Sequence, residues 1–401
     1  MPRWDLSCSS GNIESYFDRR YRPDETVRRL WPLLDELGIT RLARQTGLDR
    51  IGIPCWAAFR PNSKSLAGAQ GKGLTDAAAC ASALMEAAEV AVAEYPRAAR
   101  RTDTAARLEA GGEAWFDPMR FMPFGEELDR ARRITWLAGA DLHSHKRRWV
   151  PLDLVDMDGE TSEIEGICKT SNGLASGNTL EEAAFHALCE LIERDATTSW
   201  SMLSPSARAA RSFPCAELND QQVDDLVRKM LDAGLAVRLI DQTSDLGIPV
   251  VMALVGPADP DNARYLDVCA GYGAHPVAVR AALRALTEAA QSRITAIAAS
   301  RDDLGPAAFD ADAFAEDAAI LGHEPMAHAP RGMDLGTPLQ ELSRACVEAL
   351  SRNDIAATLV RVDGGDLPFA VVKVLSEDLE DRGANLNWRP GRRALEALWS
   401  R

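Results

Sequence analysis

The chain has 401 residues and is 46% hydrophobic, which is enough for a large buried core in one to three domains. Its 60 acidic and 45 basic side chains give a formal net charge of −15. A field of that sign repels nucleic-acid phosphates and anionic lipid, so we exclude both as partners, whereas it suits a protein that gathers carboxylates around a divalent cation.

The N-terminus and the cysteines both favour a cytoplasmic protein. The start, Met1-Pro2-Arg3-Trp4-Asp5, has no basic-then-apolar leader, and no apolar run reaches transmembrane length. The eight cysteines are scattered, and none form a Cys-x-x-Cys pair. We therefore expect reduced thiols, not a disulfide framework or a structural zinc site, and no cysteine stands out as a nucleophile.

Helices and strands are predicted to be interspersed along the chain. In chain order, hydrophobic periodicity predicts helices at 26–37, 75–94, 180–197, 219–233, 277–299 and 337–352. Strand-like runs fall at 51–59, 149–156, 235–241, 249–255, 265–272, 357–363 and 369–375, and an acidic, Ala-rich stretch covers 306–321. No dinucleotide or Walker-type glycine loop follows a strand. The pattern favours an α+β or mixed α/β fold with an antiparallel component.

A short pattern, Ala-Leu-x-Glu-x-x-(Glu or Gln), occurs three times on predicted helices. Each copy follows a loop that contains glycine. Any one copy could arise by chance in a chain rich in Ala-Leu, but three with matched acidic or amide positions indicate an old repeated unit. The copies are 83–89, 187–193 and 285–291, and their loops are 71–73, 173–177 and 271–273.

Two of these copies carry paired carboxylates. Glu86 and Glu89, like Glu190 and Glu193, are three residues apart, which puts each pair on one helix face about 4.5 Å apart along the axis. From spacing alone, a solvated acidic face explains such pairs. However, the helix that carries Glu190 has an apolar stripe on one side and a row of acids that begins at Glu182 on the other. Carboxylates from two facing helices would hold Mg²⁺ together with the phosphates of a nucleotide.

Several nearby residues have local alternatives. Thr179 and Glu182 form the pattern of a capping box, Arg284 and Glu288 are spaced as a surface ion pair, and Lys72 could belong to a plain turn. A separate candidate is the segment 141–145, Asp-Leu-His-Ser-His. On a strand its polar side chains would share one face as in a metal site, but the tip of a hairpin fits as well.

Residues 170–183, Thr-Ser-Asn-Gly-Leu-Ala-Ser-Gly-Asn-Thr-Leu-Glu-Glu-Ala, and 191–195, Leu-Ile-Glu-Arg-Asp, closely resemble the YcaO family. Two further motifs of that family occur in order. One runs from Gly71-Lys72-Gly73 into Ser82-Ala-Leu-Met-Glu86-Ala-Ala-Glu89, and the other is Arg-Ala-Leu-Thr-Glu-Ala-Ala-Gln-Ser-Arg at 284–293. The resemblance implies a YcaO-type α+β fold with mixed or antiparallel sheets and internally similar subdomains. We divide it into an N-terminal segment (1–65), a catalytic core (66–300) and a C-terminal α/β portion (301–401).

The resemblance also implies ATP and Mg²⁺ as cofactors. Carried over position by position, the magnesium ligands are Glu86, Glu89, Glu190 and Glu193. Glu190, Glu193 and Arg194 are the catalytic residues. Contacts to the nucleotide fall on Lys72, Ser82, Asn178, Glu182, Arg194, Arg284 and Glu288. Where the family has a Lys and, seven residues on, a Ser, the matching positions here are Arg19 and Thr26.

The chemistry implied is activation of a peptide backbone amide. A nucleophile adds to the carbonyl, the oxyanion attacks the γ-phosphate of ATP, and phosphate leaves with the former amide oxygen. A neighbouring Cys, Ser or Thr as nucleophile gives an azoline, and an external sulfide equivalent gives a thioamide.

Three functions remain open on these residues. The segments 38–54 and 60–64 resemble the branch that works with a TfuA-type partner, and the C-terminal tail at 387–401 has one proline where azoline-forming members have several. Both features favour a thioamide synthase. An azoline-forming cyclodehydratase is the second hypothesis, and a nucleotide-binding scaffold is the third. We expect a peptide or protein substrate, a TfuA-like partner and a homodimer.

Overall fold

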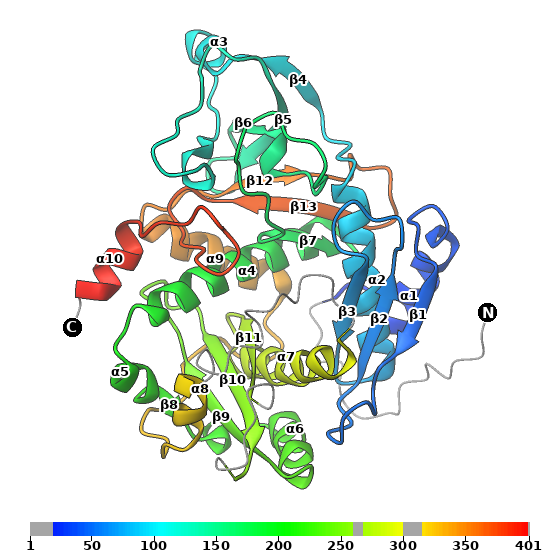
Figure 1. Ribbon diagram of the computed structural model, residues 1–401, viewed down its shortest axis with the longest axis vertical. Helices are drawn as coiled ribbons and strands as arrows, with labels where there is room; N and C mark the ends of the chain where they lie inside the picture. Colours follow the sequence, from blue (N-terminus) through cyan, green and yellow to red (C-terminus); the bar gives the residue numbers. More distant parts are fainter. Residues whose placement is uncertain (1–18, 260–267, 300–314, 400–401) are drawn as a thin grey trace. The chain divides into compact units, whose positions relative to one another are not determined.

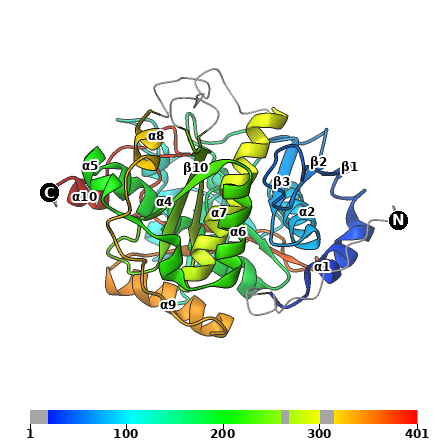
Figure 2. The same cartoon turned by 90° about the horizontal axis from the view of Figure 1, so that it is seen from below.

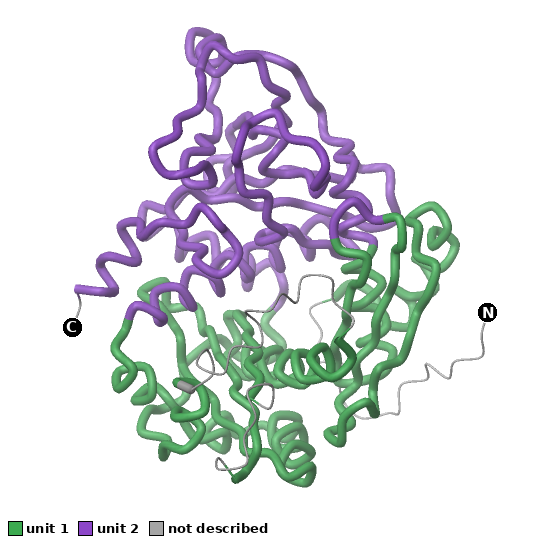
Figure 3. Tube along the Cα trace, in the orientation of Figure 1, with its two compact units in different colours: residues 1–62, 66–87, 203–337 green, residues 63–65, 88–202, 338–401 purple. Residues whose placement is uncertain are grey.

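The computed structural model describes residues 19–259, 268–299 and 315–399, which form two compact units, each built from segments that are discontinuous in sequence (Figure 3). Unit 1 comprises residues 1–62, 66–87 and 203–337, and unit 2 comprises 63–65, 88–202 and 338–401. Helix α2 (Asp76–Ala93) begins in unit 1 and ends in unit 2.

Unit 1 contains two antiparallel sheets (Figure 1). The first has the order β1-β2-β3, with β1 at Arg41–Arg44, β2 at Cys55–Phe59 and β3 at Gly68–Lys72. The second has the order β11-β10-β9-β8, with β8 at Ser212–Phe213, β9 at Leu235–Asp241, β10 at Val250–Pro257 and β11 at Cys269–Ala274. The helices of this unit are α1 (Pro23–Leu30), α5 (Pro205–Ala209), α6 (Gln221–Asp232), α7 (Ala278–Ala298) and α8 (Ala315–Leu321).

The core of unit 1 lies between the four-stranded sheet and two helices. Val223, Leu226 and Met230 repeat at helical spacing on α6 and are buried, which turns one face of that helix to the core. Helix α7 packs along β10 and β11 and beside α6 (Figure 2). Because β10 is covered in this way, its residues 250–256 form a continuous buried run and not an alternating one.

Unit 2 is built on one six-stranded sheet, in which every strand pairing is antiparallel. The order is β4-β5-β12-β13-β7, with β6 paired to β5. The strands are β4 (Arg100–Asp103), β5 (Ile134–Asp141), β6 (Arg147–Pro151), β7 (Leu174–Gly177), β12 (Thr358–Arg361) and β13 (Ala370–Leu375). The helices are α3 (Ala105–Ala110), α4 (Leu180–Ser201), α9 (Leu339–Arg352) and α10 (Arg392–Trp399).

Helix α4 is buried on most of its sides. It contacts β7 and β13 of the sheet, and α9 and α10 pack against it (Figure 1). Its side chains at Ala183, Ala187 and Ile192 have no exposed surface. The polar residues of α4 are therefore placed by a rigid scaffold and not by a surface helix.

The three repeated motifs share one packing device. Each consists of a strand followed by a helix, β3–α2, β7–α4 and β11–α7, in which glycines of the strand touch the backbone of the helix. A Cβ atom on Gly71 would lie 2.1 Å from the backbone nitrogen of Ala83, and one on Gly271 would lie 2.2 Å from the carbonyl oxygen of Ala285. A Cβ atom on Gly177 would lie 2.5 Å from the backbone nitrogen of Ala183. In all three motifs, glycines thus allow the strand and the helix to approach closely.

The α+β fold with antiparallel sheets is confirmed, and several predicted boundaries shift. The first helix ends at Leu30 and continues only as a 3₁₀ turn at Trp31–Leu33, because Pro32 has no N–H for an α-helical bond. The strand predicted at 51–59 begins at Cys55, after Pro54, and the one at 149–156 begins at Arg147 and ends at Pro151. Gly71, Gly271 and Gly273 lie in strands and not in loops. The interpretation of Lys72 as part of a plain turn was therefore wrong, because Lys72 is the last residue of β3.

The other predicted helices and strands are found within a few residues of their expected bounds. Parts of two predictions, 265–267 and 306–314, lie outside the described residues. Among the helices of the described ranges, none combines the length and the apolar composition that crossing a membrane requires.

Replacing Gly271 by Ala should lower the free energy of unfolding by about 1–3 kcal/mol or more, because the added methyl group meets helix backbone on two sides. Urea titration followed by circular dichroism measures the change. The control is Gly383→Ala, where a Cβ has no atom within 4 Å and the backbone is not left-handed, so the shift should stay within about 0.5 kcal/mol. Equal stabilities of the two variants would contradict the packing argument.

Candidate active site

The start of helix α4 is fixed by its own side chains. The hydroxyl of Thr179 accepts a hydrogen bond from the Glu182 N–H at 3.2 Å, as an N-cap residue does. In return, Oε2 of Glu182 accepts from the backbone N–H and the side-chain amide of Asn178, at 3.0 and 3.1 Å. Glu182 is 1% exposed. The N-cap role of Thr179 is confirmed. Glu182 bonds back to Asn178, the residue before the cap, and so holds Asn178 at the start of the helix.

Two turns further along α4, the paired carboxylates share a cation. Arg194 Nη2 lies 3.5 Å from Glu190 Oε1 and 3.3 Å from Glu193 Oε1. Glu193 is 3% exposed, so the interpretation of this pair as a solvated acidic face was wrong. Two like charges on one helix face repel, and the guanidinium between them offsets that repulsion.

A buried lysine on the neighbouring strand is the second cation near these carboxylates. Lys373 lies on β13 and is 1% exposed. Burial lowers the pKa of its ammonium to about 8, whereas the charges of Glu190, Asp381 and Glu89 favour the protonated form. Glu89, which α2 carries into unit 2, therefore lies in the same electrostatic environment as Glu190.

The loop before β7 is tied to the same group of residues. Lys373 Nζ donates a hydrogen bond to the carbonyl of Thr170. The side-chain amide of Asn172 donates to Asp381 Oδ1 at 2.7 Å, and the Gly173 N–H donates to Glu190 Oε2 at 3.1 Å. The Thr-Ser-Asn-Gly segment is thus held by the residues that surround the α4 carboxylates.

The C-terminal segment anchors the far end of the acidic row. Arg393 on α10 donates two hydrogen bonds to Asp195, from Nε to Oδ1 and from Nη2 to Oδ2, both at 2.8 Å. The two side chains are 5% and 0% exposed. Asp195 directly follows Arg194, so this buried bidentate pair fixes the backbone from which Arg194 projects.

Unit 1 has a polar group of its own on the β3–α2 and β11–α7 motifs. Lys72, the last residue of β3, forms an ion pair with Glu288 on α7. Glu288 also accepts from the Tyr272 N–H at 3.3 Å. Burial, together with the nearby charge of Arg284, lowers the pKa of His275 to about 3, and its Nδ1 accepts from the Val277 N–H at 2.9 Å. His275 is therefore a neutral imidazole beside Arg284.

The remaining predicted residues differ in burial. Arg19 is exposed ahead of α1, while Thr26 on α1 is 4% exposed. Ser82 on α2 is half-buried, and Glu86, one turn before Glu89 on that helix, is exposed.

The segment 141–145 loses its support as a metal site. Residues 142–145 connect β5 and β6 as a hairpin tip, in which Asp141 Oδ1 accepts from the N–H and hydroxyl of Ser144 at 2.6 and 2.7 Å, so the hairpin interpretation holds. The described cysteines are free, and burial raises the pKa of Cys55 and Cys80 to about 12 and that of Cys215 to about 11. These three thiols stay protonated and make poor nucleophiles.

The donor set of unit 2 fits a hard divalent cation. Among residues 19–259, 268–299 and 315–399, no three His, Cys, Asp or Glu side chains form a ready-made metal cluster. Instead, Arg194 Nη2 lies within 3.5 Å of Glu190 and Glu193, and the charges of Glu190, Asp381 and Glu89 act on the buried ammonium of Lys373. These four carboxylates and two cations together carry a formal charge of −2. Oxygen ligands with that excess charge suit Mg²⁺, which is held by a few carboxylates and completes its shell with phosphate.

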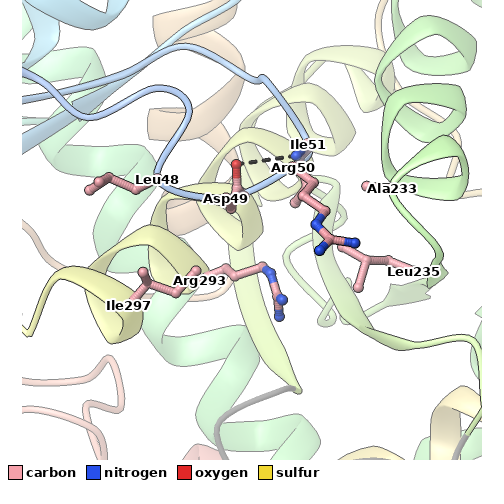
Figure 4. A pocket seen from close by; sticks show the side chains of 8 residues that line it. All are labelled: Leu48, Asp49, Arg50, Ile51, Ala233, Leu235, Arg293 and Ile297. Atoms are coloured by element: carbon pink, nitrogen blue, oxygen red, sulfur yellow. Dashed lines mark hydrogen bonds between the residues drawn. The ribbon is translucent and has the colours of Figure 1, made fainter.

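A small pocket in unit 1 contains none of the predicted residues (Figure 4). Its volume is about 320 Å³. Asp49 Oδ1 accepts from the Ile51 N–H at 3.2 Å, and Arg50 and Arg293 contribute guanidinium groups to the same space. The lining residues are Leu48, Asp49, Arg50, Ile51, Ala233, Leu235, Arg293 and Ile297.

The described residues thus form an α+β fold with antiparallel sheets, in which glycines of the strands touch helix backbone and α4 carries carboxylates close to Arg194. The family model described as YcaO cyclodehydratase, ATP- and Mg²⁺-binding, matches residues 70–380. The chain belongs to the YcaO family, and its cofactors are ATP and Mg²⁺.

Relatives and solved structures agree with this assignment. A protein of Rhizobium leguminosarum bv. trifolii, named for its position in the tfuA 3′ region, is 41% identical over 75% of this chain and 73% of its own. A protein of Methanothermobacter thermautotrophicus is 35% identical over 72% and 74%.

Two solved structures share the fold at 22% sequence identity. A YcaO from Methanopyrus kandleri bound with AMPPCP and Mg²⁺ superposes with a TM-score of 0.69 and covers 90% of this chain and 92% of its own. A heterocyclase in complex with substrate and cofactor superposes with a TM-score of 0.75; the match covers 90% of this chain and spans 53% of that longer one.

Removal of the buried guanidinium by Arg393→Met should destabilise the protein by about 3–5 kcal/mol, because Asp195 is left as an uncompensated buried charge. Urea unfolding measures the loss. The matched control is Arg392→Met, the exposed neighbour on the same helix, which should change stability by no more than about 0.5 kcal/mol. If Arg393→Met unfolds at the same urea concentration as the control, the ion pair does not anchor α10.

Proposed function

We propose that this protein is an ATP-dependent peptide thioamide synthase, in which a backbone amide oxygen is replaced by sulfur. The observation that carries the ATP-dependent activity is the partly buried group around Glu190, in which carboxylates of α2 and α4 share the cations Lys373 and Arg194. Such a group, with its excess of negative charge, would hold Mg²⁺ next to nucleotide phosphates.

The roles of individual residues follow from their contacts. Glu89, Glu190 and Glu193, with Glu86 one turn earlier on α2, would hold the metal, which when bound neutralises charge on the phosphates. Arg194 orients Glu190 and Glu193 and is available to a transferring phosphoryl group. Asn178, fixed by Glu182, lies at the start of α4, where backbone N–H groups favour an anion.

The resemblance to the family also assigns nucleotide contacts to residues of unit 1. Lys72 is held at the end of β3 by Glu288, and Arg284 lies beside the neutral His275, which adds no positive charge of its own. With Ser82, Arg19 and Thr26 these residues complete the proposed set. Glu288 sets the position of Lys72, and the two basic side chains supply positive charge for phosphates.

One observation supports sulfur transfer over ring formation. The Rhizobium relative is named for the tfuA 3′ region, which supports a TfuA-like partner for this chain as well. The Cys55, Cys80 and Cys215 thiols are buried and stay protonated, so none of these three is suited to carry the sulfur, and the proposal takes a sulfide equivalent from outside the protein. In the balanced reaction, the amide oxygen leaves on phosphate, ATP becomes ADP, and the added sulfide becomes the thioamide sulfur. On the same resemblance, we propose a homodimer that acts in the cytoplasm.

An azoline-forming cyclodehydratase is the second candidate, because the family description and the heterocyclase neighbour both name that chemistry. Intact mass spectrometry of candidate peptides, incubated with this protein, a TfuA-like partner, ATP, Mg²⁺ and sulfide, separates the two. A mass gain equal to the exchange of one oxygen for sulfur supports the thioamide synthase. Loss of one water molecule from a peptide that contains Cys, Ser or Thr would instead identify the protein as a cyclodehydratase. If the protein binds ATP but releases no phosphate with any peptide, the third hypothesis, a nucleotide-binding scaffold, is the one that stands.

The variant Glu190→Gln should lose peptide-dependent ATP hydrolysis by at least about a hundredfold while staying folded. Gln keeps the shape and an oxygen that can accept the Gly173 N–H, but removes the negative charge. Phosphate release measures activity, and thermal unfolding checks the fold. Glu181→Gln, an exposed carboxamide swap on the same helix, is the control and should retain full rates. Full turnover by Glu190→Gln would show that the metal assignment is wrong.

A further inference from the structure

Lys373 is unusual for its position in the fold. Strand β13 is buried at every residue, and Lys373 is the one charged side chain in its run Ala-Val-Val-Lys-Val-Leu. An ammonium group is rarely placed in such a strand, because burial removes its hydration. The charge therefore requires a compensating environment in the fold.

That environment consists of the proposed metal-binding carboxylates. Glu190 on α4, Asp381 after β13 and Glu89 on α2 all act on the Lys373 ammonium and raise its pKa, and Cys168 does so more weakly. Burial is the larger effect and lowers the pKa to about 8. The carbonyl that Lys373 bonds, that of Thr170, belongs to the loop whose Gly173 N–H donates to Glu190 Oε2. Arg194, whose Nη2 lies 3.5 Å from Glu190 Oε1, is the other cation of the group.

Structural support for the loop does not account for the charge. The Lys373 ammonium donates a hydrogen bond to the Thr170 carbonyl, and a neutral amide side chain can donate to a carbonyl as well. A neutral residue would avoid the cost of a buried cation. The positive charge is explained if it acts on the carboxylates and on whatever they bind.

We propose that Lys373 is a resident cation that makes divalent-metal binding depend on the nucleotide. This inference rests on the proposed function, since it takes the carboxylates around Glu190 as the metal site. A metal ion among these carboxylates is repelled by the ammonium that already compensates them. Phosphates of a nucleotide add the negative charge that offsets this repulsion. Metal and nucleotide then enter the site together, and the site does not retain a metal ion alone.

The test measures binding of Mn²⁺ alone, by loss of its free electron paramagnetic resonance signal, to the full-length protein and to Lys373→Met. The wild type should bind Mn²⁺ weakly, and tightly only with a non-hydrolysable ATP analogue. Lys373→Met should bind Mn²⁺ alone roughly tenfold or more tightly than the wild type. A gain of affinity is informative, because mere damage to the loop would weaken binding. Adding Glu190→Gln to Lys373→Met should remove the gain.

Two further variants serve as controls. Lys146→Met removes one positive charge from an exposed hairpin tip and should leave Mn²⁺ binding unchanged. Lys373→Gln keeps a donor for Thr170, replaces Lys373→Met if that variant fails to fold, and should show the same gain.

The outcomes separate the two proposals. If wild type and Lys373 variants bind Mn²⁺ alone equally, yet all bind it with the analogue, the role of Lys373 is overturned and the metal site stands. Tight binding of Mn²⁺ alone by the wild type also overturns it. If no protein binds Mn²⁺ even with the analogue, the proposed function fails and this inference fails with it.

Discussion

The arrangement of unit 2 depends on the mutual repulsion of carboxylates that the fold brings together. Glu190 and Glu193 lie on one face of a buried helix, and Glu89 and Asp381 act on the same buried ammonium as Glu190. Such charges can be buried only with positive partners, because desolvation of an isolated carboxylate costs several kcal/mol. Arg194 and Lys373 provide that compensation but leave an excess of negative charge. The Thr-Ser-Asn-Gly loop is tied to the same charges, because the Asn172 amide donates to Asp381 and the Gly173 N–H donates to Glu190.

Glycine residues allow the strand and the helix of each repeat to pack with their backbones in contact. A helix normally packs on a sheet through side chains, which keep the two backbones well apart. At Gly71, Gly177 and Gly271 no side chain intervenes, and the helix backbone lies where a Cβ would otherwise be. In each case the helix bears an acidic residue at the same place in its motif: Glu86, Glu190 and Glu288. The repeat therefore places an acidic residue on each helix that packs closely on a strand, and in one copy that residue, Glu288, forms an ion pair with Lys72.

Local signals in the sequence predicted much of the fold and part of the site. Periodicity located α4, α6 and α7 within a few residues, since long amphipathic or apolar helices leave a strong pattern. Boundaries moved where proline interrupts hydrogen bonding, as at Pro32 and Pro54. Motif spacing found Glu190, Glu193 and Arg194, which share one helix. It missed Lys373, Asp381 and His275, because their partners are distant in sequence and only the tertiary fold brings them together. A lysine within a continuous apolar strand was the available signal for Lys373.

The C-terminal segment links the stability of unit 2 to the position of Arg194. Asp195 and Glu380 have no exposed side-chain surface, and their partners, Arg393 and Arg120, reach them from α10 and from the segment before β5. Glu380 also accepts from the indole of Trp388, and Asp195 accepts from the Glu380 N–H. The last turns of α4 are thus enclosed by residues nearly two hundred positions later in the chain. A helix that must hold charges at fixed positions gains from such enclosure, because a small rotation of α4 would move Glu190 away from the Gly173 N–H of the neighbouring loop. Residues 380–393 therefore stabilise the last turns of α4 through buried ion pairs.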